Sequence, residues 1–265
     1  MLRTITTKIL FENRWSLFFW TLGLLFMTWL TFIFYPSFGQ SGSLDSISQS
    51  LPPALRGLLG DIASLKTIGG YINSEILSMR IPLLMSIMSI ALAVGQTAGD
   101  EERGTLQTLL ALPVSRTRAL SEKYLAVLIM LGVGAFSVWL GLEFGLLSIH
   151  DSYSAKLLLE AVVNTWLIMV AFGSVAFCVG AVTGRRGVAI GIGSLFAFGS
   201  FFLTSFSDSV EKLKNIGHFT LYHVYTDVNV ASVGLNVRDT LILIGSSLIL
   251  FLVSLLVFNR RDLRN

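Results

Sequence analysis

Charged residues are scarce in this 265-residue sequence. Asp, Glu, Lys and Arg make up 13% of the chain, whereas soluble domains carry about 25%. Hydrophobic residues make up 53%, and the mean hydropathy is +0.73. Too few charged groups are present to cover the surface of a water-soluble enzyme, and the same composition excludes a disordered chain. We therefore expect a membrane-embedded protein.

The sequence has one cysteine and no nucleotide-binding motif, and each of these facts excludes a class of site. Cys178 is the single cysteine, which excludes an intramolecular disulfide and a cysteine-built metal site. The pattern Gly-x-x-x-x-Gly-Lys-[Ser/Thr] is absent, so no phosphate-cradling loop can hold a nucleotide with Mg²⁺. We expect no catalytic residues, no cofactor and no metal in this chain. The net charge of +3 favours anionic lipid head groups over nucleic acid as the counterion.

Six uncharged runs are long enough to cross a bilayer, which takes about 20 apolar residues in a helix. They are Trp15–Tyr35, Ile81–Gly99, Tyr124–Leu142 with a continuation to Ile149, Ala161–Gly184, Gly187–Ser207 and Thr240–Asn259. No internal repeat or soluble domain interrupts them. The sequence therefore predicts an all-α polytopic membrane protein in which residues 1–265 form a single domain.

The distribution of basic residues predicts the topology. An even number of spans places both termini on one side, and Lys and Arg mark the cytoplasmic side. Segments on the side of the termini carry 12 basic and 6 acidic residues, a net charge of +6, whereas the opposite segments carry 7 and 10, a net charge of −3. We expect both termini in the cytoplasm and the protein in the plasma membrane.

Three connecting segments have predicted positions. In residues 1–14 the apolar Leu2, Ile5 and Ile9 lie opposite charged residues, which is typical of a helix in the head-group plane. Residues 36–80 form a long outer loop whose stretch 51–59 has an apolar helical face. Residues 208–239 form the last outer loop.

The connection at residues 99–123 lies on the cytoplasmic side. Asp100, Glu101 and Glu102 stand where acidic residues favour a helix N-terminus, and Pro113 ends the stretch. Between them, leucines recur at helical spacing, which predicts one helix of about two to three turns. Such a short apolar stripe needs a surface to pack on, either the chain's own spans and the lipid or a partner. The leucines are Leu106, Leu109 and Leu110.

The stretch Gly-Asp-Glu-Glu-Arg-Gly-Thr-Leu-Gln-Thr-Leu-Leu-Ala-Leu-Pro-Val-Ser-Arg, residues 99–116, followed by Lys123, resembles the loop after the second span of type 2 ATP-binding-cassette (ABC) transporter permeases. The ending Phe258–Leu263 is also similar to the tail of that family. The six spans, the amphipathic start, the long outer loop and the short turn at Gly184–Gly187 agree with its layout.

The resemblance implies the permease subunit of an ATP-driven exporter in a prokaryotic plasma membrane. Residues 100–116 would form a coupling helix seated in a groove of a separate ATPase, which binds ATP and Mg²⁺. Two permeases, as a homodimer or heterodimer, and two ATPases would form the complex. In this interface the leucines would pack and the charged residues would set the docking orientation. The predicted interface comprises Glu101, Glu102, Arg103, Gly104, Thr105, Leu106, Leu109, Leu110, Pro113 and Arg116.

Two alternatives belong to other classes of protein. The chain could be a polytopic scaffold that anchors a cytoplasmic assembly, or a membrane enzyme with an unrecognised site. Glu143 interrupts the third span near its outer end. An intramembrane carboxylate is a candidate for the translocation path, but a position near the wet interface is the simpler explanation of Glu143.

Other candidate sites have simpler explanations. His218, His223 and Asp227 do not share a clear helical face, so interfacial aromatic residues explain that loop better than a metal site does. Met79, Met85 and Met88 are typical apolar filler rather than copper ligands. Small residues in the fourth and fifth spans predict close helix approach, either within one subunit or between two. They are Gly173, Ser174, Ala176, Gly180, Gly187, Gly191, Gly193, Ser194 and Gly199.

Overall fold

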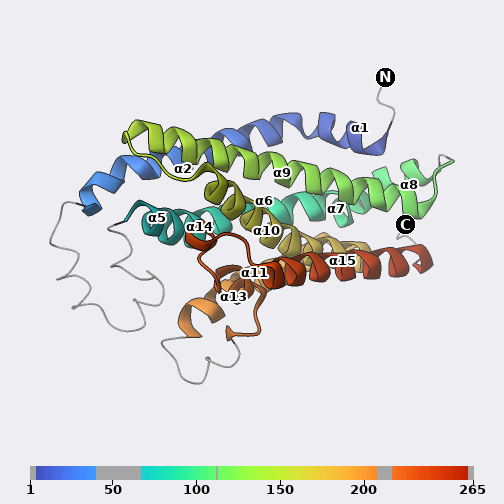
Figure 1. Cartoon of the computed structure of the whole chain (residues 1–265). Helices are drawn as coiled ribbons and strands as arrows, with labels where there is room; N and C mark the ends of the chain where they lie inside the picture. The colour runs from blue at the N-terminus through green and yellow to red at the C-terminus, as the bar shows by residue number, and fades with distance from the viewer. Residues whose placement is uncertain (1–3, 40–66, 112, 208–216, 262–265) are drawn as a thin grey trace.

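The computed structural model describes residues 4–39, 67–111, 113–207 and 217–261. Within these ranges the chain is helical and contains no strand. The long helices lie side by side in one bundle, and both termini lie at the same end of it (Figure 1). The helices are α1 (Ile5–Glu12), α2 (Arg14–Gly39), α5 (Ile68–Tyr71), the π-helix η2 (Ile72–Arg80), α6 (Ile81–Gly95), α7 (Ala98–Glu102), α8 (Thr105–Leu110), α9 (Arg116–Ser148), α10 (Ala155–Thr183), α11 (Arg186–Ser207), α13 (Leu221–Thr226), α14 (Val230–Val233) and α15 (Val237–Arg260).

Six candidate membrane spans are present among the described residues, which confirms the predicted polytopic all-α class. They are Arg14–Tyr35, Ile68–Gly95, Arg116–Ser148, Ala155–Thr183, Arg186–Ser207 and Val237–Arg260. The predicted outer loop 36–80 therefore ends in helix, because residues 68–80 continue into the second span. Inside the predicted outer loop 208–239, the described part carries α13 and α14. The amphipathic stretch 51–59 and residues 208–216 lie outside the described residues.

The helix α10 forms the centre of the bundle. In its most hydrophobic window 83% of the residues are buried, compared with 22% for α2, 28% for α11 and 22% for α15. The second span also contributes to the core, since Met85 and Met88 are fully buried. The apolar outer faces of α2, α11 and α15 therefore face lipid or another subunit.

Glycines allow α9 to approach α2 closely. A Cβ at Gly145 would overlap the ring of the buried Phe32, and a Cβ at Gly141 would lie 2.7 Å from Thr28 Cβ and 2.8 Å from the Leu25 carbonyl oxygen. Small residues are what such close helix packing in membranes requires. The contact at Gly141 is the less adaptable of the two, because it involves backbone.

We expect Gly141→Ala to lower the stability of the protein by about 1–3 kcal/mol, the usual cost of overpacking. Gly132→Ala is the matched control, because its nearest neighbour, Trp166 Nε1, would lie at an ordinary 3.7 Å on the same helix. Alanine is the better helix former, so this control should be neutral or stabilising. Thermal unfolding in detergent measures both, and equal melting temperatures would contradict the packing described.

Candidate functional site

The predicted cytoplasmic connection consists of two short helices rather than one. α7 and α8 are joined through Gly104, whose φ of +70° lies in the left-handed region that favours glycine. The Thr105 hydroxyl donates hydrogen bonds to the Asp100 carbonyl oxygen at 3.0 Å and to Asp100 Oδ1 at 3.2 Å, which fixes the angle between the helices. Both helices lie at the end of the bundle that holds the termini (Figure 1).

The inner side of this connection belongs to the chain's own core. Leu106 is 2% exposed and packs in the hydrophobic core, because an apolar side chain is more stable there than in water. Glu101 is buried and forms an ion pair with Arg261. Leu106 and Glu101, which were predicted to contact a partner, therefore make contacts within the chain. Leu109 is half-buried, and the side chain of Leu110 lies outside the described atoms.

The outer side is polar and exposed. We call it the coupling surface and define it as Glu102, Arg103, Thr105, Thr108 and Pro113. Glu102 also accepts a hydrogen bond from the Arg186 backbone N–H at 3.1 Å, which links α7 to the start of α11.

A second set of contacts ties α7 to the end of the last helix. The Arg261 guanidinium bonds the Glu101 carboxylate and also donates to the Val182 carbonyl oxygen at 3.2 Å. Arg116 donates in turn to the Arg261 carbonyl oxygen at 2.6 Å, so the predicted interface residue Arg116 acts inside the chain. Gly184 leaves room for this contact, because a Cβ there would lie 2.6 Å from Arg261 Nη1. Sequence reasoning assigned no role to Arg261.

A buried ion pair joins α7 to α9. Lys123 Nζ lies 2.5 Å from Asp100 Oδ2 and 3.1 Å from the Gln96 carbonyl oxygen. The Lys123 side chain is 3% exposed and that of Asp100 is 19% exposed. The α7–α8 unit is therefore held by charged contacts to α9, to the start of α11 and to the residue that follows α15.

The family model described as ABC-2 family transporter protein matches residues 4–263. The chain belongs to this family. Membership identifies it as a multi-pass membrane permease component of an ABC transporter and implies an ABC ATPase as its partner. A comparison with curated proteins finds no match.

The amphipathic start of this ABC-2 permease is fastened to the third span. Glu122 Oε2 accepts hydrogen bonds from the backbone N–H groups of Ile5 at 2.6 Å and Thr6 at 3.3 Å, and Arg118 lies 2.9 Å from Glu122 Oε1. An acidic group at a helix N-terminus bonds free N–H groups and interacts favourably with the helix dipole. Glu122 thus positions α1 against α9.

We expect Glu122→Ala to release α1, at a cost of about 1–3 kcal/mol for the backbone donors that lose their acceptor. Hydrogen–deuterium exchange of the peptide that covers residues 4–12 should become faster, because local opening requires less free energy. The control is Glu12→Ala, which removes an exposed carboxylate 3.7 Å from Lys8. Unchanged exchange in Glu122→Ala would show that Glu122 does not hold this helix.

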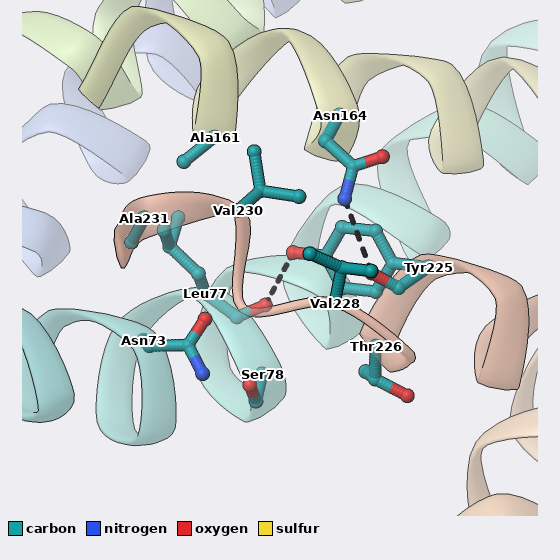
Figure 2. A pocket seen from close by; sticks show the side chains of 10 residues that line it. All are labelled: Asn73, Leu77, Ser78, Ala161, Asn164, Tyr225, Thr226, Val228, Val230 and Ala231. Atoms are coloured by element: carbon teal, nitrogen blue, oxygen red, sulfur yellow. Dashed lines mark hydrogen bonds between the residues drawn. The ribbon is translucent and has the colours of Figure 1, made fainter. Parts of the chain in front are cut away.

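At the opposite end of the permease, tyrosines bind the π-helix η2. The Tyr225 hydroxyl donates to the Leu77 carbonyl oxygen at 2.6 Å, and the Tyr222 hydroxyl donates to that of Ser78. Asn164 Nδ2 bonds the Tyr225 carbonyl oxygen at 3.1 Å (Figure 2). Burial raises the pKa of both tyrosines, so their hydroxyls remain protonated donors at neutral pH. The small cavity beside them, about 20 Å³, has room for about one water molecule.

Glu143 and two histidines were the remaining candidates, for the translocation path and for a metal site. Glu143 lies in α9, and its Oε1 is buried without a hydrogen-bond partner among the described residues; its role in translocation stays a prediction. His218 Nδ1 lies 2.9 Å from His223 Nε2. The described ranges contain no group of three His, Cys, Asp or Glu side chains arranged to hold a metal ion.

The small residues of the fourth span are used within the chain. A Cβ at Gly173 would overlap Ser89 Oγ, and one at Gly180 would overlap Thr97 Oγ1. In α11, Gly193 approaches Ala176, whereas Gly187 and Gly191 have open space around them. The two explanations of the small residues thus divide between the helices: contact within the subunit for the fourth span, and a free face for part of the fifth.

Proposed function

We propose that the chain is the membrane half of an ATP-driven exporter and that the coupling surface docks onto a separate ABC ATPase, which binds ATP and Mg²⁺. The observation that carries the proposal is the two-sided construction of α7–α8. Its outer side is exposed and polar and contacts the start of α11 through Glu102, whereas its inner side is joined to α9 and to the end of α15 by buried ion pairs. A partner that moves the outer side would therefore also move the spans.

The complex proposed contains two permease chains and two ATPases. The exposed apolar faces of α2, α11 and α15 and the open glycines of α11 support a second permease chain in the membrane. The second permease chain is either identical, which gives a homodimer, or different, which gives a heterodimer. Both termini and α7–α8 are placed in the cytoplasm, in agreement with the excess of basic residues at these segments. Export follows from the family resemblance of the sequence.

Affinity purification of the tagged chain from its native membrane in mild detergent tests the proposal. We expect a stoichiometric ATPase subunit with the wild type, and its loss in the variant Thr108→Lys, which adds a cation to the coupling surface. The matched control is Ser152→Lys, at the exposed turn between α9 and α10. If the ATPase stays with all three proteins, the coupling surface is misassigned. If no ATPase accompanies the wild type, the proposed coupling to a separate ATPase is overturned.

A further inference from the structure

A groove of about 360 Å³ opens between α1, α2 and the α6–α8 segment. This volume lies within the range of roughly 300–1,000 Å³ that small-molecule sites occupy. Its polar part is lined by four basic residues, Lys8, Lys123, Arg103 and Arg186, and by the acidic Glu12 and Asp100. The groove is therefore cationic overall.

The two acidic residues in the groove already have cationic partners. Glu12 lies 3.7 Å from Lys8, and Asp100 lies 2.5 Å from Lys123. The guanidinium groups of Arg103 and Arg186 have no carboxylate within 4.0 Å in the ranges that the structure describes. Two uncompensated guanidinium groups thus line one groove, and guanidinium is the side chain best matched to phosphate oxygens.

The other part of the groove is apolar and belongs to the membrane spans. Trp20 of α2 and Leu92 and Ala91 of α6 line it, and Ala91 is exposed. Tryptophan is typical of the level at which lipid head groups meet the acyl chains. A ligand that fills the groove would therefore need an anionic end and an apolar end.

We propose that this groove binds the phosphodiester head group of an anionic phospholipid, with Arg103 and Arg186 bonding the phosphate and the acyl chains leaving along α2 and α6. A protein segment is the less suitable occupant, because the apolar part is continuous with the spans and the α1 helix covers one side. Arg103 and Thr105 belong both to the coupling surface and to the lining of this groove. The lipid assignment rests on the charge and lining of the groove and not on export.

Native mass spectrometry of the purified full-length chain, titrated with dioleoyl phosphatidylglycerol, tests the assignment. The wild type should bind this lipid more tightly than dioleoyl phosphatidylcholine, which has the same chains and no net charge. The variant Arg103→Gln/Arg186→Gln should bind this lipid with an affinity at least about tenfold lower, because two charge-assisted contacts are lost. The control Arg185→Gln/Arg260→Gln also removes two exposed charges at this end of the bundle and should bind like the wild type.

Competition with sn-glycerol 3-phosphate separates the two sources of phosphate. Failure to displace the lipid supports a membrane lipid as the occupant, whereas displacement at equal concentration would overturn the lipid assignment in favour of a soluble phosphate. Equal lipid affinity of the two double variants would overturn the site. Loss of the ATPase in Arg103→Gln/Arg186→Gln with unchanged lipid affinity would also overturn it and would assign the groove to the protein partner.

Discussion

Arg261→Ala is expected to destabilise the protein by about 3–5 kcal/mol, because it breaks a buried ion pair by removing one partner. The side chains of Arg261 and Glu101 are 17% and 3% exposed, so water screens the pair little. The substitution also removes the hydrogen bond to the Val182 carbonyl oxygen. Thermal unfolding of the detergent-solubilised protein measures the change.

The double variant Glu101→Gln/Arg261→Met separates the ion pair from other effects of truncation. Replacing both partners leaves no unpaired charge, so we expect a smaller loss than in Arg261→Ala. Arg260→Ala, which removes the exposed neighbouring arginine, should change stability by less than about 0.5 kcal/mol. If Arg261→Ala unfolds at the same temperature as Arg260→Ala, α7 is not tied to the end of α15 as described.

Substitution of Asp100 is expected to lower the stability of the protein more than substitution of its partner Lys123. Asp100→Asn leaves the Lys123 ammonium buried with neutral acceptors alone, the Gln96 carbonyl oxygen and the introduced amide oxygen, and should cost about 3–5 kcal/mol because the opposite charge is lost. Lys123→Met should cost less, because the Asp100 side chain keeps 19% exposure and can be hydrated. Thermal unfolding of the two variants decides the point, and a larger loss in Lys123→Met would contradict the burial described.

The exposed pair of Lys8 and Glu12 is the control for that asymmetry. Their side chains are 57% and 58% exposed, and such surface pairs contribute about 0–1 kcal/mol. Glu12→Gln should therefore leave the unfolding temperature nearly unchanged. A loss as large as that of Asp100→Asn would mean that charge in general, rather than a buried pair, stabilises this end of the bundle.

Flanking charges predicted the span boundaries well where they lie at the membrane surface. The predicted run Gly187–Ser207 differs by one residue from α11, because Arg186 marks its start. The second span was predicted to begin at Ile81, but its helix begins at Ile68. Arg80 lies 2.6 Å from Glu75 within the same helical stretch. A charge that is paired inside a helix does not mark the end of that helix, and the sequence pattern does not distinguish the two situations.

The position of the α7–α8 connection could be predicted from the sequence, but its contacts within the chain could not. Leucine spacing indicated an apolar face, and Leu106 does lie on one, although it faces the chain's own core. The break at Gly104 depends on a left-handed backbone that spacing does not reveal. The partner of Glu101 is Arg261, 160 residues away in the sequence, and a single sequence contains no periodicity over such a separation.

Site-specific cross-linking from Thr108 detects contact between the coupling surface and a separate ATPase. Because Cys178 is the single cysteine and is buried, Cys178→Ser provides a background in which Thr108→Cys is the one labelled site. A benzophenone maleimide attached there should yield a photo-cross-linked product that contains the ATPase, whereas the same label at Ser152→Cys should not. Absence of the ATPase from the Thr108 product, or equal cross-linking at both positions, would contradict the account.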